Sequence, residues 1–271
     1  MMRSLWSAAS GMTSQQLKVD TISNNLANVN TVGYKKERVE FKSLLYDTMV
    51  KAGVNENGEG KPVPLQVGHG VRPVATSINF TQGTIENTEN DFDFAIDGKG
   101  FFTVLGPNNE EHYTRDGSFK LSVSEDSIML VTSDGYPILD SEGEPIELDD
   151  NIDLSKLEIG RDGAFRYINE DNEVEELDIS FRINQFNNPI GLEKVGDNLL
   201  RRTSASGEPL LEGEDDDLVN STILSKNLEV SNVQVVEEMV DMIVSQRAYE
   251  VSSKSIQTSD DMLAQVNQLK R

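Results

Sequence analysis

Apolar residues recur at helical spacing near the start of the chain. Between residues 5 and 29 they fall three or four positions apart, interrupted only by Gln15, and this period places them on one face of a helix. The stripe consists of Leu5, Ala8, Met12, Val19, Ile22, Leu26 and Val29. The pattern predicts an amphipathic helix from about Ser4 to Asn28, which ends where a run of Asn and Gly residues begins.

A second stripe of the same kind covers residues 233–269. It is formed by Val233, Val236, Val240, Ile243, Val244, Ala248, Val251, Met262, Val266 and Leu269. Ser231 and Gln234 have the spacing of a capping box at the start of this helix. At ~1.5 Å per residue the helix is about 55 Å long, and we expect it to project from the rest of the chain.

An apolar stripe usually covers the core of its own molecule. Here each helix lies beyond a loop or arm, and the two stripes are suited both to each other and to neighbouring copies. Isolated helices are weak without packing. We therefore expect disordered termini in the monomer that become ordered on assembly. The predicted assembly interface comprises Leu5, Met12, Val19, Ile22, Leu26, Val29, Val236, Val240, Ile243, Val251, Met262, Val266 and Leu269.

From Val71 the apolar period changes to two, which is typical of strands. Four Asp-Gly dipeptides, which favour the turns of tight hairpins, separate strand-like runs. Together these features predict an antiparallel sheet, sandwich or barrel. The expected fold class is α+β, with paired terminal helices that resemble a coiled coil around a β-rich middle. The expected parts are an N-terminal helix (1–33), a connecting arm (34–70), a β-rich domain (71–225) and a C-terminal helix (226–271).

The connecting arm has two parts with different patterns. Residues 34–50 are amphipathic and fit either a strand or a short helix. Residues 52–70 contain seven Gly and Pro residues, which argue against regular structure there.

Net charge separates the ends of the chain from its middle. Residues 1–50 carry +2 and residues 226–271 carry −2, so residues 51–225, with 13 basic and 36 acidic side chains, carry the entire −23. Such a middle repels nucleic acid and anionic lipid, which predicts a hydrated surface and no nucleic-acid partner. The chain has no cysteine and no apolar run long enough for a membrane-spanning segment.

Candidate chemistry is sparse. His69 and His112 lie outside any metal or catalytic motif, and their interpretation is as satisfied surface residues. The acidic run 212–217 lacks the ligand spacing of a calcium loop and is interpreted as a solvated loop with, at most, weak cation binding. We therefore expect no enzyme, no catalytic or metal site and no cofactor.

One segment carries a specific motif. It comprises Ser23, Asn24, Asn25, Leu26, Ala27, Asn28, Thr31, Gly33, Tyr34 and Lys35. This segment resembles the signature S-N-N-L-A-N-x-x-T-x-G-[FY]-K of the rod and hook axial proteins of the bacterial flagellum, with every fixed position present. The C-terminal segments 228–233, 238–240, 246–250 and 256–258 are similar to the same family.

The middle is similar to the distal rod branch of that family. The similarity lies in residues 1–6, 71–76, 95–102 and 113–119, and in the Gly-Leu-Glu and Gly-Asp-Asn runs of residues 191–198. A proximal rod or hook subunit of the same family is the alternative. The middle is more acidic than the family leads one to expect.

The resemblance implies a structural subunit that polymerises into a stiff hollow tube, transmits motor torque to the hook and lets axial proteins pass through. The implied partners are further copies of the chain, proximal rod and hook subunits, the surrounding basal-body rings and a rod-capping protein. The implied location is the flagellar basal body. Export is expected to proceed through the flagellar type III channel without a cleavable signal peptide, since Met1–Trp6 is not followed by an unbroken apolar region.

Overall fold

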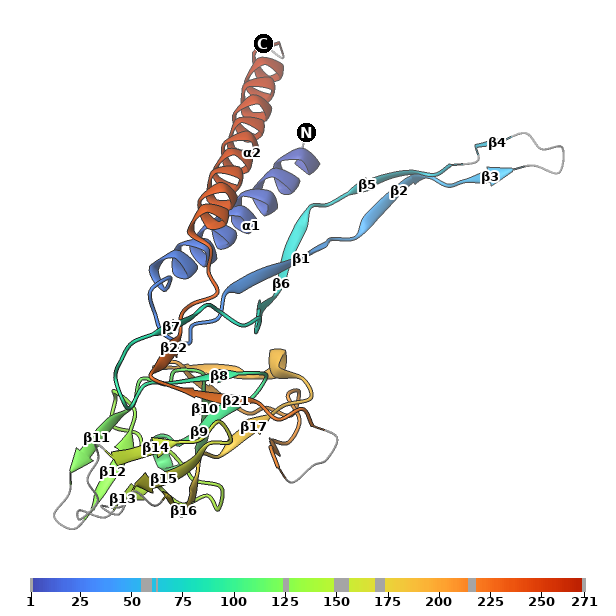
Figure 1. Ribbon diagram of the computed structural model, residues 1–271. Helices are drawn as coiled ribbons and strands as arrows, with labels where there is room; N and C mark the ends of the chain where they lie inside the picture. Colours follow the sequence, from blue (N-terminus) through green and yellow to red (C-terminus); the bar gives the residue numbers. More distant parts are fainter. Residues whose placement is uncertain are drawn as a thin grey trace. The chain divides into compact units, whose positions relative to one another are not determined.

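The computed structural model describes residues 2–54, 60–61, 63–123, 127–148, 156–168, 174–213 and 218–269. The chain forms two compact units (Figure 1). The helical unit consists of Met1–Ala27, Glu37–Ile78 and Gln234–Arg271. The β-rich unit consists of Asn28–Lys36 and Asn79–Val233. An N-terminal helix, a C-terminal helix and a middle of antiparallel strands confirm the predicted α+β class.

Two long helices form most of the helical unit. They are α1, Met2–Ala27, and α2, Val235–Leu269, so both predicted helices are confirmed to within two residues at each end. The predicted capping box is wrong. Because α2 begins at Val235, Ser231 lies outside the helix, and its hydroxyl accepts a hydrogen bond from the Val233 amide at 3.3 Å.

A ribbon of paired strands completes the helical unit (Figure 1). Antiparallel pairs join β1 (Glu37–Ser43) to β6 (Val71–Ile78), β2 (Tyr46–Val50) to β5 (Leu65–Gly68), and β3 (Gly53–Val54) to β4 (Gly60–Lys61). Residues 34–50 therefore contain strands and no helix. The expectation of irregular structure across residues 52–70 is wrong for β3, β4 and β5, because the facing strands provide partners for their backbone groups.

Two local features let this ribbon tolerate Gly and Pro. The Tyr46 ring lies over Gly68, its strand partner, with ring atoms 3.2–3.6 Å from where a Cβ would be. The register shifts between Glu40 and Phe41, opposite Pro73. A bulge is the usual place for a proline within a sheet, since proline has no amide hydrogen to donate.

The β-rich unit consists of several small antiparallel sheets. Its largest has the strand order β18-β19-β10-β9-β17-β20, and three-stranded sheets have the orders β11-β12-β13 and β14-β15-β16. Pairs of strands join β21 to β8 and β22 to β7. The bounds of the strands are β7 Ile85–Asn87, β8 Phe94–Asp97, β9 Phe101–Leu105, β10 Glu111–Thr114, β11 Lys120–Val123, β12 Ile128–Val131, β13 Glu147–Leu148, β14 Leu157–Ile159, β15 Ala164–Ile168, β16 Val174–Ser180, β17 Ile183–Gln185, β18 Glu193–Gly196, β19 Leu199–Arg201, β20 Leu210–Leu211, β21 Thr222–Ser225 and β22 Asn227–Glu229; the 3₁₀ turns η1 and η3 cover Pro107–Asn109 and Pro189–Gly191.

Aromatic rings hold these sheets together in one core. The Phe181 ring lies 5.0 Å from Phe165, 5.1 Å from Phe94 and 5.5 Å from Phe102, measured between ring centroids. Phe94, Phe102 and Phe165 belong to three different sheets. Edge-to-face and tilted ring pairs of this kind add to the stabilisation from burial, so the separate sheets pack as one unit.

Two of the four Asp-Gly dipeptides lie in hairpin turns, as predicted. Gly163 (φ +84°) connects β14 to β15, and Gly135 (φ +89°) turns the chain after β12. The hairpin prediction is wrong for Gly98 and Gly117, because each connects strands of different sheets. At Gly117 the backbone crosses Phe94 so closely that a Cβ would overlap the Phe94 carbonyl oxygen, which explains why glycine is needed there.

The units divide the chain differently from the expected parts. Strand β6 begins at Val71, the expected start of the β-rich domain, yet it pairs with β1 in the helical unit. Strand β22 lies in the expected C-terminal helix segment but pairs with β7 in the β-rich unit. Pairing between distant strands decides both assignments, and sequence period carries no information about such partners.

Candidate assembly interface and junction cluster

The two helices of the helical unit meet along a seam of small and polar side chains. On α1 the seam residues recur every seven positions, at Ser4, Gly11, Lys18 and Asn25. Their partners on α2 are Ser259, Ser252, Asp241 and Glu238. Residue numbers fall along α2 as they rise along α1, so the helices run antiparallel.

Each contact across the seam is weak or local. The Ser4 and Ser259 hydroxyls lie 3.4 Å apart, and a Cβ at Gly11 would lie 3.3 Å from Ser252 Oγ. The Lys18 Nζ to Asp241 Oδ1 ion pair spans 3.7 Å and is partly exposed. Such exposed pairs contribute about 0–1 kcal/mol. The seam therefore sets the register of the helices through small and polar side chains.

The predicted apolar stripes do not form this seam. The six described α2 members, Val236, Val240, Ile243, Val251, Met262 and Val266, are 44–75% exposed. In the N-terminal stripe Ile22 is buried, whereas Leu5, Met12, Val19, Leu26 and Val29 are partly buried. Val29 lies just beyond α1, in the β-rich unit. Leu269 ends α2 and its side chain is outside the described residues.

The suggestion that the two stripes are natural partners for each other is therefore wrong for α2. Glu238, Ser245 and Ser259 are buried on the seam side of α2, while most of its Val, Ile and Met residues face solvent and only Met242 and Ile256 among them are partly buried. Single exposed apolar residues are ordinary, but a contiguous apolar face marks an interaction surface. The helical unit thus presents α2 as an open apolar face.

The helical unit has a hollow that borders both α1 and α2. Ala9, Met12, Thr13, Gln16, Leu17 and Asp20 line an open hollow of about 510 Å³ together with Pro73 of β6 and Tyr249 and Ile256 of α2. All of these residues belong to the helical unit. The lining is mainly apolar and uncharged polar, with Asp20 as its one charged side chain, which suits a packed helix better than an anionic ligand.

The signature segment begins in the last turn of α1. There Asn25 is buried, and its amide pairs with Glu37 as a strand backbone would. Nδ2 donates to the Glu37 carbonyl at 2.9 Å, and the Glu37 amide donates to Oδ1 at 3.0 Å. Nδ2 also donates to Glu238 Oε2 at 3.2 Å. Asn25 therefore fixes α1, β1 and α2 at one point, whereas its neighbours Ser23 and Asn24 are exposed.

The rest of the signature packs into the β-rich unit. Ala27 ends α1, and the Asn28 side chain accepts a hydrogen bond from the Thr31 hydroxyl at 3.1 Å. Gly33 has φ +67°, and its amide donates to the Glu229 carbonyl at 2.7 Å. The Tyr34 ring is buried beneath Lys194, whose Nζ lies 4.4 Å from the ring centroid.

Lys35, Glu229 and Arg115 form a buried group that we name the junction cluster. Lys35 Nζ donates to Glu229 Oε1 at 2.5 Å and to the Thr81 carbonyl at 3.0 Å. Arg115 donates to Glu229 Oε2 at 3.3 Å and to the Gly98 carbonyl at 2.7 Å. All three side chains are at least 95% buried. Two cations and one anion thus share a site closed to water.

Burial dominates the electrostatics of the junction cluster. It lowers the pKa of Lys35, and Glu229 opposes this by favouring the charged amine. Burial likewise lowers the pKa of Arg115, again against the attraction of Glu229. The single carboxylate is therefore what lets both cations stay charged inside the unit.

Sequence reasoning named Lys35 only as part of a motif, and it missed Glu229 and Arg115 as its partners. Glu229 and Arg115 lie within segments that resemble the family, but no role was predicted for either side chain. An isolated Glu or Arg in a strand pattern gives no local sign of burial, since most such residues are exposed. Pairing of residues 194 positions apart becomes visible only in the fold.

Replacing Gly33 with Ala should destabilise the β-rich unit by about 3 kcal/mol. The positive φ costs about 1 kcal/mol for an L-residue, and the new Cβ would lie 2.6 Å from backbone atoms of Arg115 and Asp116, which cannot move cheaply. Urea unfolding followed by circular dichroism measures the effect. The matched control is Gly135→Ala, because Gly135 has φ +89° but open space around it, and it should cost only about 1 kcal/mol. Equal losses in the two variants would contradict the close-contact argument.

The described residues offer little for catalysis. No three His, Cys, Asp or Glu side chains among them come together as a metal ion requires. His112 is buried, not at the surface as interpreted from the sequence, and its ring nitrogen lies 2.9 Å from the Glu110 carbonyl. Of the acidic run 212–217, residues 214–217 lie outside the described part, and Glu212 accepts hydrogen bonds from Ser221 and Gln185.

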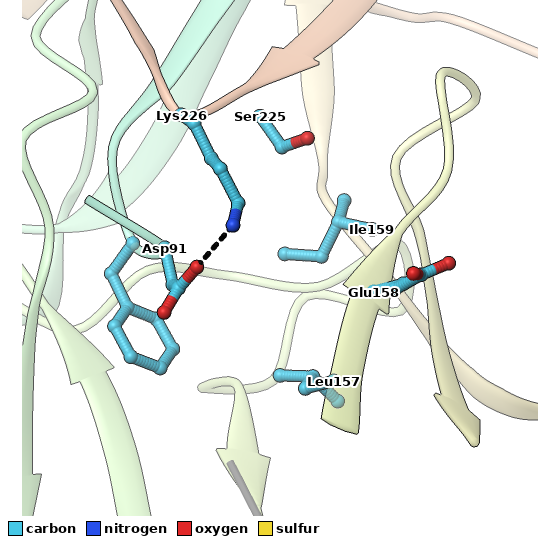
Figure 2. Close-up of a pocket in the computed structure, with 7 residues that line it drawn as sticks. Asp91, Leu157, Glu158, Ile159, Ser225 and Lys226 are labelled. Carbon is cyan, nitrogen blue, oxygen red and sulfur yellow. Dashed lines mark ion pairs between the residues drawn. The ribbon is translucent and has the colours of Figure 1, made fainter. Parts of the chain in front are cut away.

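A hollow of about 240 Å³ in the β-rich unit also lacks a reactive arrangement (Figure 2). Leu157, Ile159 and Phe92 line it, and Asp91 and Lys226 point toward one another with an ion pair of 2.7 Å. The hydrogen bond that Lys226 donates to the Asp91 carboxylate raises the pKa of Lys226, which keeps this amine protonated and unsuited to act as a nucleophile.

Two terminal helices, of which α2 presents an outward apolar face, together with a β-rich unit are typical of structural proteins that associate with other chains. Family comparisons agree with this class. The sequence model described as "Flagella basal body rod protein" matches residues 5–35, "Flagellar hook protein FlgE/F/G D1 domain" matches 95–167, and "Flagellar basal body rod FlgEFG protein C-terminal" matches 224–269. Neither helix in the described part of the chain is long and apolar enough to cross a membrane.

Similar proteins cover the full chain. The flagellar basal-body rod protein FlgG of Borreliella burgdorferi is 46% identical over all of both chains. Proteins of the same name from Caulobacter vibrioides and Bacillus subtilis are 38% and 35% identical, over 99% and 100% of this chain and all of their own length. The chain belongs to the flagellar basal-body rod protein family.

Proposed function

We propose that the chain is a subunit of the flagellar distal rod, polymerising into a stiff hollow tube that transmits motor torque to the hook. The observation that supports this most directly is the orientation of α2. Most of its Val, Ile and Met side chains face solvent, while the small and polar seam faces α1. A helix pair built in this way places small and polar groups against each other and leaves its apolar surface for other copies.

The mechanism is transmission of force without chemistry. Burying a Val, Ile or Met side chain contributes about 1.5–3 kcal/mol. Six such side chains on α2, with the partly buried members of the N-terminal stripe, give each subunit several favourable contacts with its neighbours. The hollow on α1 provides one surface able to receive them. Repetition of these contacts along many copies makes the tube stiff.

The proposed partners follow from the family and the proposed tube. They are other copies of the chain, proximal rod and hook subunits, the surrounding basal-body rings and a rod-capping protein. The proposed location is the basal body, reached through the flagellar type III channel without a cleavable signal peptide. The hydrated, acidic β-rich unit is the part proposed to face outward, and the central channel lets further axial proteins pass.

Polymerisation of the purified chain tests this function. The chain is refolded at rising concentration, with and without fragments of native rods as seeds, and imaged by cryo-electron microscopy. We expect straight tubes with a central channel above a critical concentration. A chain that stays monomeric with seeds, or stops at closed dimers, would contradict the proposal.

In the monomer, amides of α1 and α2 should exchange hydrogen with solvent at nearly unfolded rates. The seam contacts are made by small and polar side chains, and helices without extensive packing are marginal in water. Hydrogen exchange with mass spectrometry at high dilution measures this. Amides of β9 and β10 in the buried core of the other unit are the internal control and should be protected. Protection of residues 5–29 in the dilute monomer comparable to that of β9 would show that the helices do not need assembly.

A further inference from the structure

Four chain connections lead between the two units, and the β-rich unit joins the ends of three of them. The Asn79 amide donates to the Lys36 carbonyl at 2.8 Å. The Asn232 side chain accepts from the Lys36 amide at 2.8 Å and donates to the Asn79 carbonyl at 2.9 Å. Lys36 is the last residue of one segment of the β-rich unit, and Asn79 is the first residue of the other, which ends at Val233. Asn232 is the residue before that end. Three distant stretches of chain are thus connected in a closed triangle.

The junction cluster joins this triangle to the core. Glu229, three residues before Asn232, accepts from Lys35 and, at 2.7 Å, from the Gly83 amide. Its other oxygen accepts from Arg115, whose guanidinium lies 5.0 Å from the centroid of the buried Phe101 ring on β9. All three segments of the triangle are thereby linked through the Glu229 carboxylate to Arg115 and β9, and the segment of Lys36 has a further contact with the same sheet through Lys194 of β18, which donates to the Lys35 carbonyl at 3.3 Å.

Close packing leaves no room for a ligand in this place. A Cβ on Gly83 would overlap the Val230 carbonyl oxygen, and a Cβ on Gly33 would touch the Arg115 backbone. Burying a carboxylate between two cations is expensive and contributes little net stability compared with an apolar core. A role in holding particular chain segments together explains such a cluster better than stability alone.

We propose that the triangle and the junction cluster form a mechanical interlock, in which force entering the β-rich unit through one connection is shared by three and passed to the core through Glu229. This inference rests on the proposed torque-bearing function. Asn232 and Glu229 are its positioning residues: Asn232 connects the segments, and Glu229 holds them on Arg115. Bonds loaded together must break together, whereas bonds loaded one after another peel at low force.

Single-molecule pulling in two directions tests the interlock. Because the chain has no cysteine, attachment points can be introduced freely at exposed sites. In the first geometry, cysteines replace Gln257 on α2 and Asp134 in the β-rich unit, so force enters through the segment that carries Asn232. In the second, cysteines replace Asp134 and Asn187, and force crosses the β-rich unit alone.

Asn232→Ala should unfold the β-rich unit about tenfold faster at equal force in the first geometry and no more than about twofold faster in the second. Glu229→Gln also removes a buried ion pair of the whole unit, so it should accelerate unfolding in both geometries, and more in the first than in the second. Asn227→Ala is the control, because Asn227 lies in the same segment and its side chain bonds only locally, to the Ser225 carbonyl at 2.7 Å. It should leave both rates unchanged.

An unchanged rate for Asn232→Ala in the first geometry would overturn the interlock. So would equal acceleration in both geometries, since that is the mark of a purely stabilising residue. Pulling uses the monomeric full chain, so it is independent of polymerisation. If tubes form but the rates are equal, the interlock fails and the proposed function stands; if the rates differ but no tubes form with seeds, the proposed function fails.

Discussion

A Val240→Asp chain should fold as a monomer and fail to polymerise. Val240 is more than half exposed in the helical unit, so the monomer does not depend on it. In the proposed tube this side chain would be buried against a neighbour. The variant loses about 1.5–3 kcal/mol of apolar burial and must in addition desolvate a carboxylate. Each 1.4 kcal/mol is a factor of ten in affinity, so the critical concentration should rise by at least about 100-fold.

Sedimentation of seeded polymer measures this, and circular dichroism checks that the strands are intact. The control is Gln257→Asp, which places the same charge at an exposed polar position of the same helix and should polymerise nearly as the unmodified chain does. Leu26→Asp should also block assembly. Because Leu26 is partly buried in the monomer, this substitution also destabilises the helical unit itself, so Val240→Asp is the cleaner test. Normal tubes from Val240→Asp chains would show that α2 does not supply the interface.

The sequence predicts both helices and their stripes because a period of 3.6 is strong over long segments. What it cannot predict is which face turns inward. Ser4, Gly11, Lys18 and Asn25 recur as regularly as the apolar residues do, and a pattern shows which residues share a face, not what covers it. In this chain the small residues let the helices approach, and the apolar stripe of α2 remains outside.

The β-rich unit is predictable in kind and unpredictable in pairing. Alternation and Asp-Gly turns predict antiparallel strands, and two of the turns are hairpins. The pairs that close the unit, such as β8 with β21, join segments more than 100 residues apart. Nothing in a local pattern selects such partners. For the same reason residues 28–36 could not be placed in this unit, nor Glu229 opposite Lys35.

Replacing Glu229 with Gln should lower the free energy of unfolding of the β-rich unit by about 3–5 kcal/mol. The substitution keeps the shape of the side chain but leaves Lys35 and Arg115 buried together without their anion, and breaking a buried charge pair from one side costs about this much. Urea unfolding at pH 7 measures the loss. The matched control is Glu193→Gln, whose carboxylate pairs with Arg201 at 2.8 Å on the exposed surface and should contribute less than about 1 kcal/mol.

The loss in Glu229→Gln should shrink as pH rises from 7 toward 10. Burial already lowers the pKa of Lys35 in the native chain, and removing Glu229 takes away the group that opposes this. Between the lowered native pKa and the unfolded value near 10.5, the unfolded chain binds more protons than the native chain, so stability rises with pH. The unmodified chain has the smaller pKa shift and should gain less over the same range. Adding Lys35→Met to Glu229→Gln removes the titrating amine, and the double variant should show no such gain. A deficit that is constant with pH would mean that the buried amine does not cause the loss, and that the hydrogen bond from the Gly83 amide to the Glu229 carboxylate is what the segment depends on.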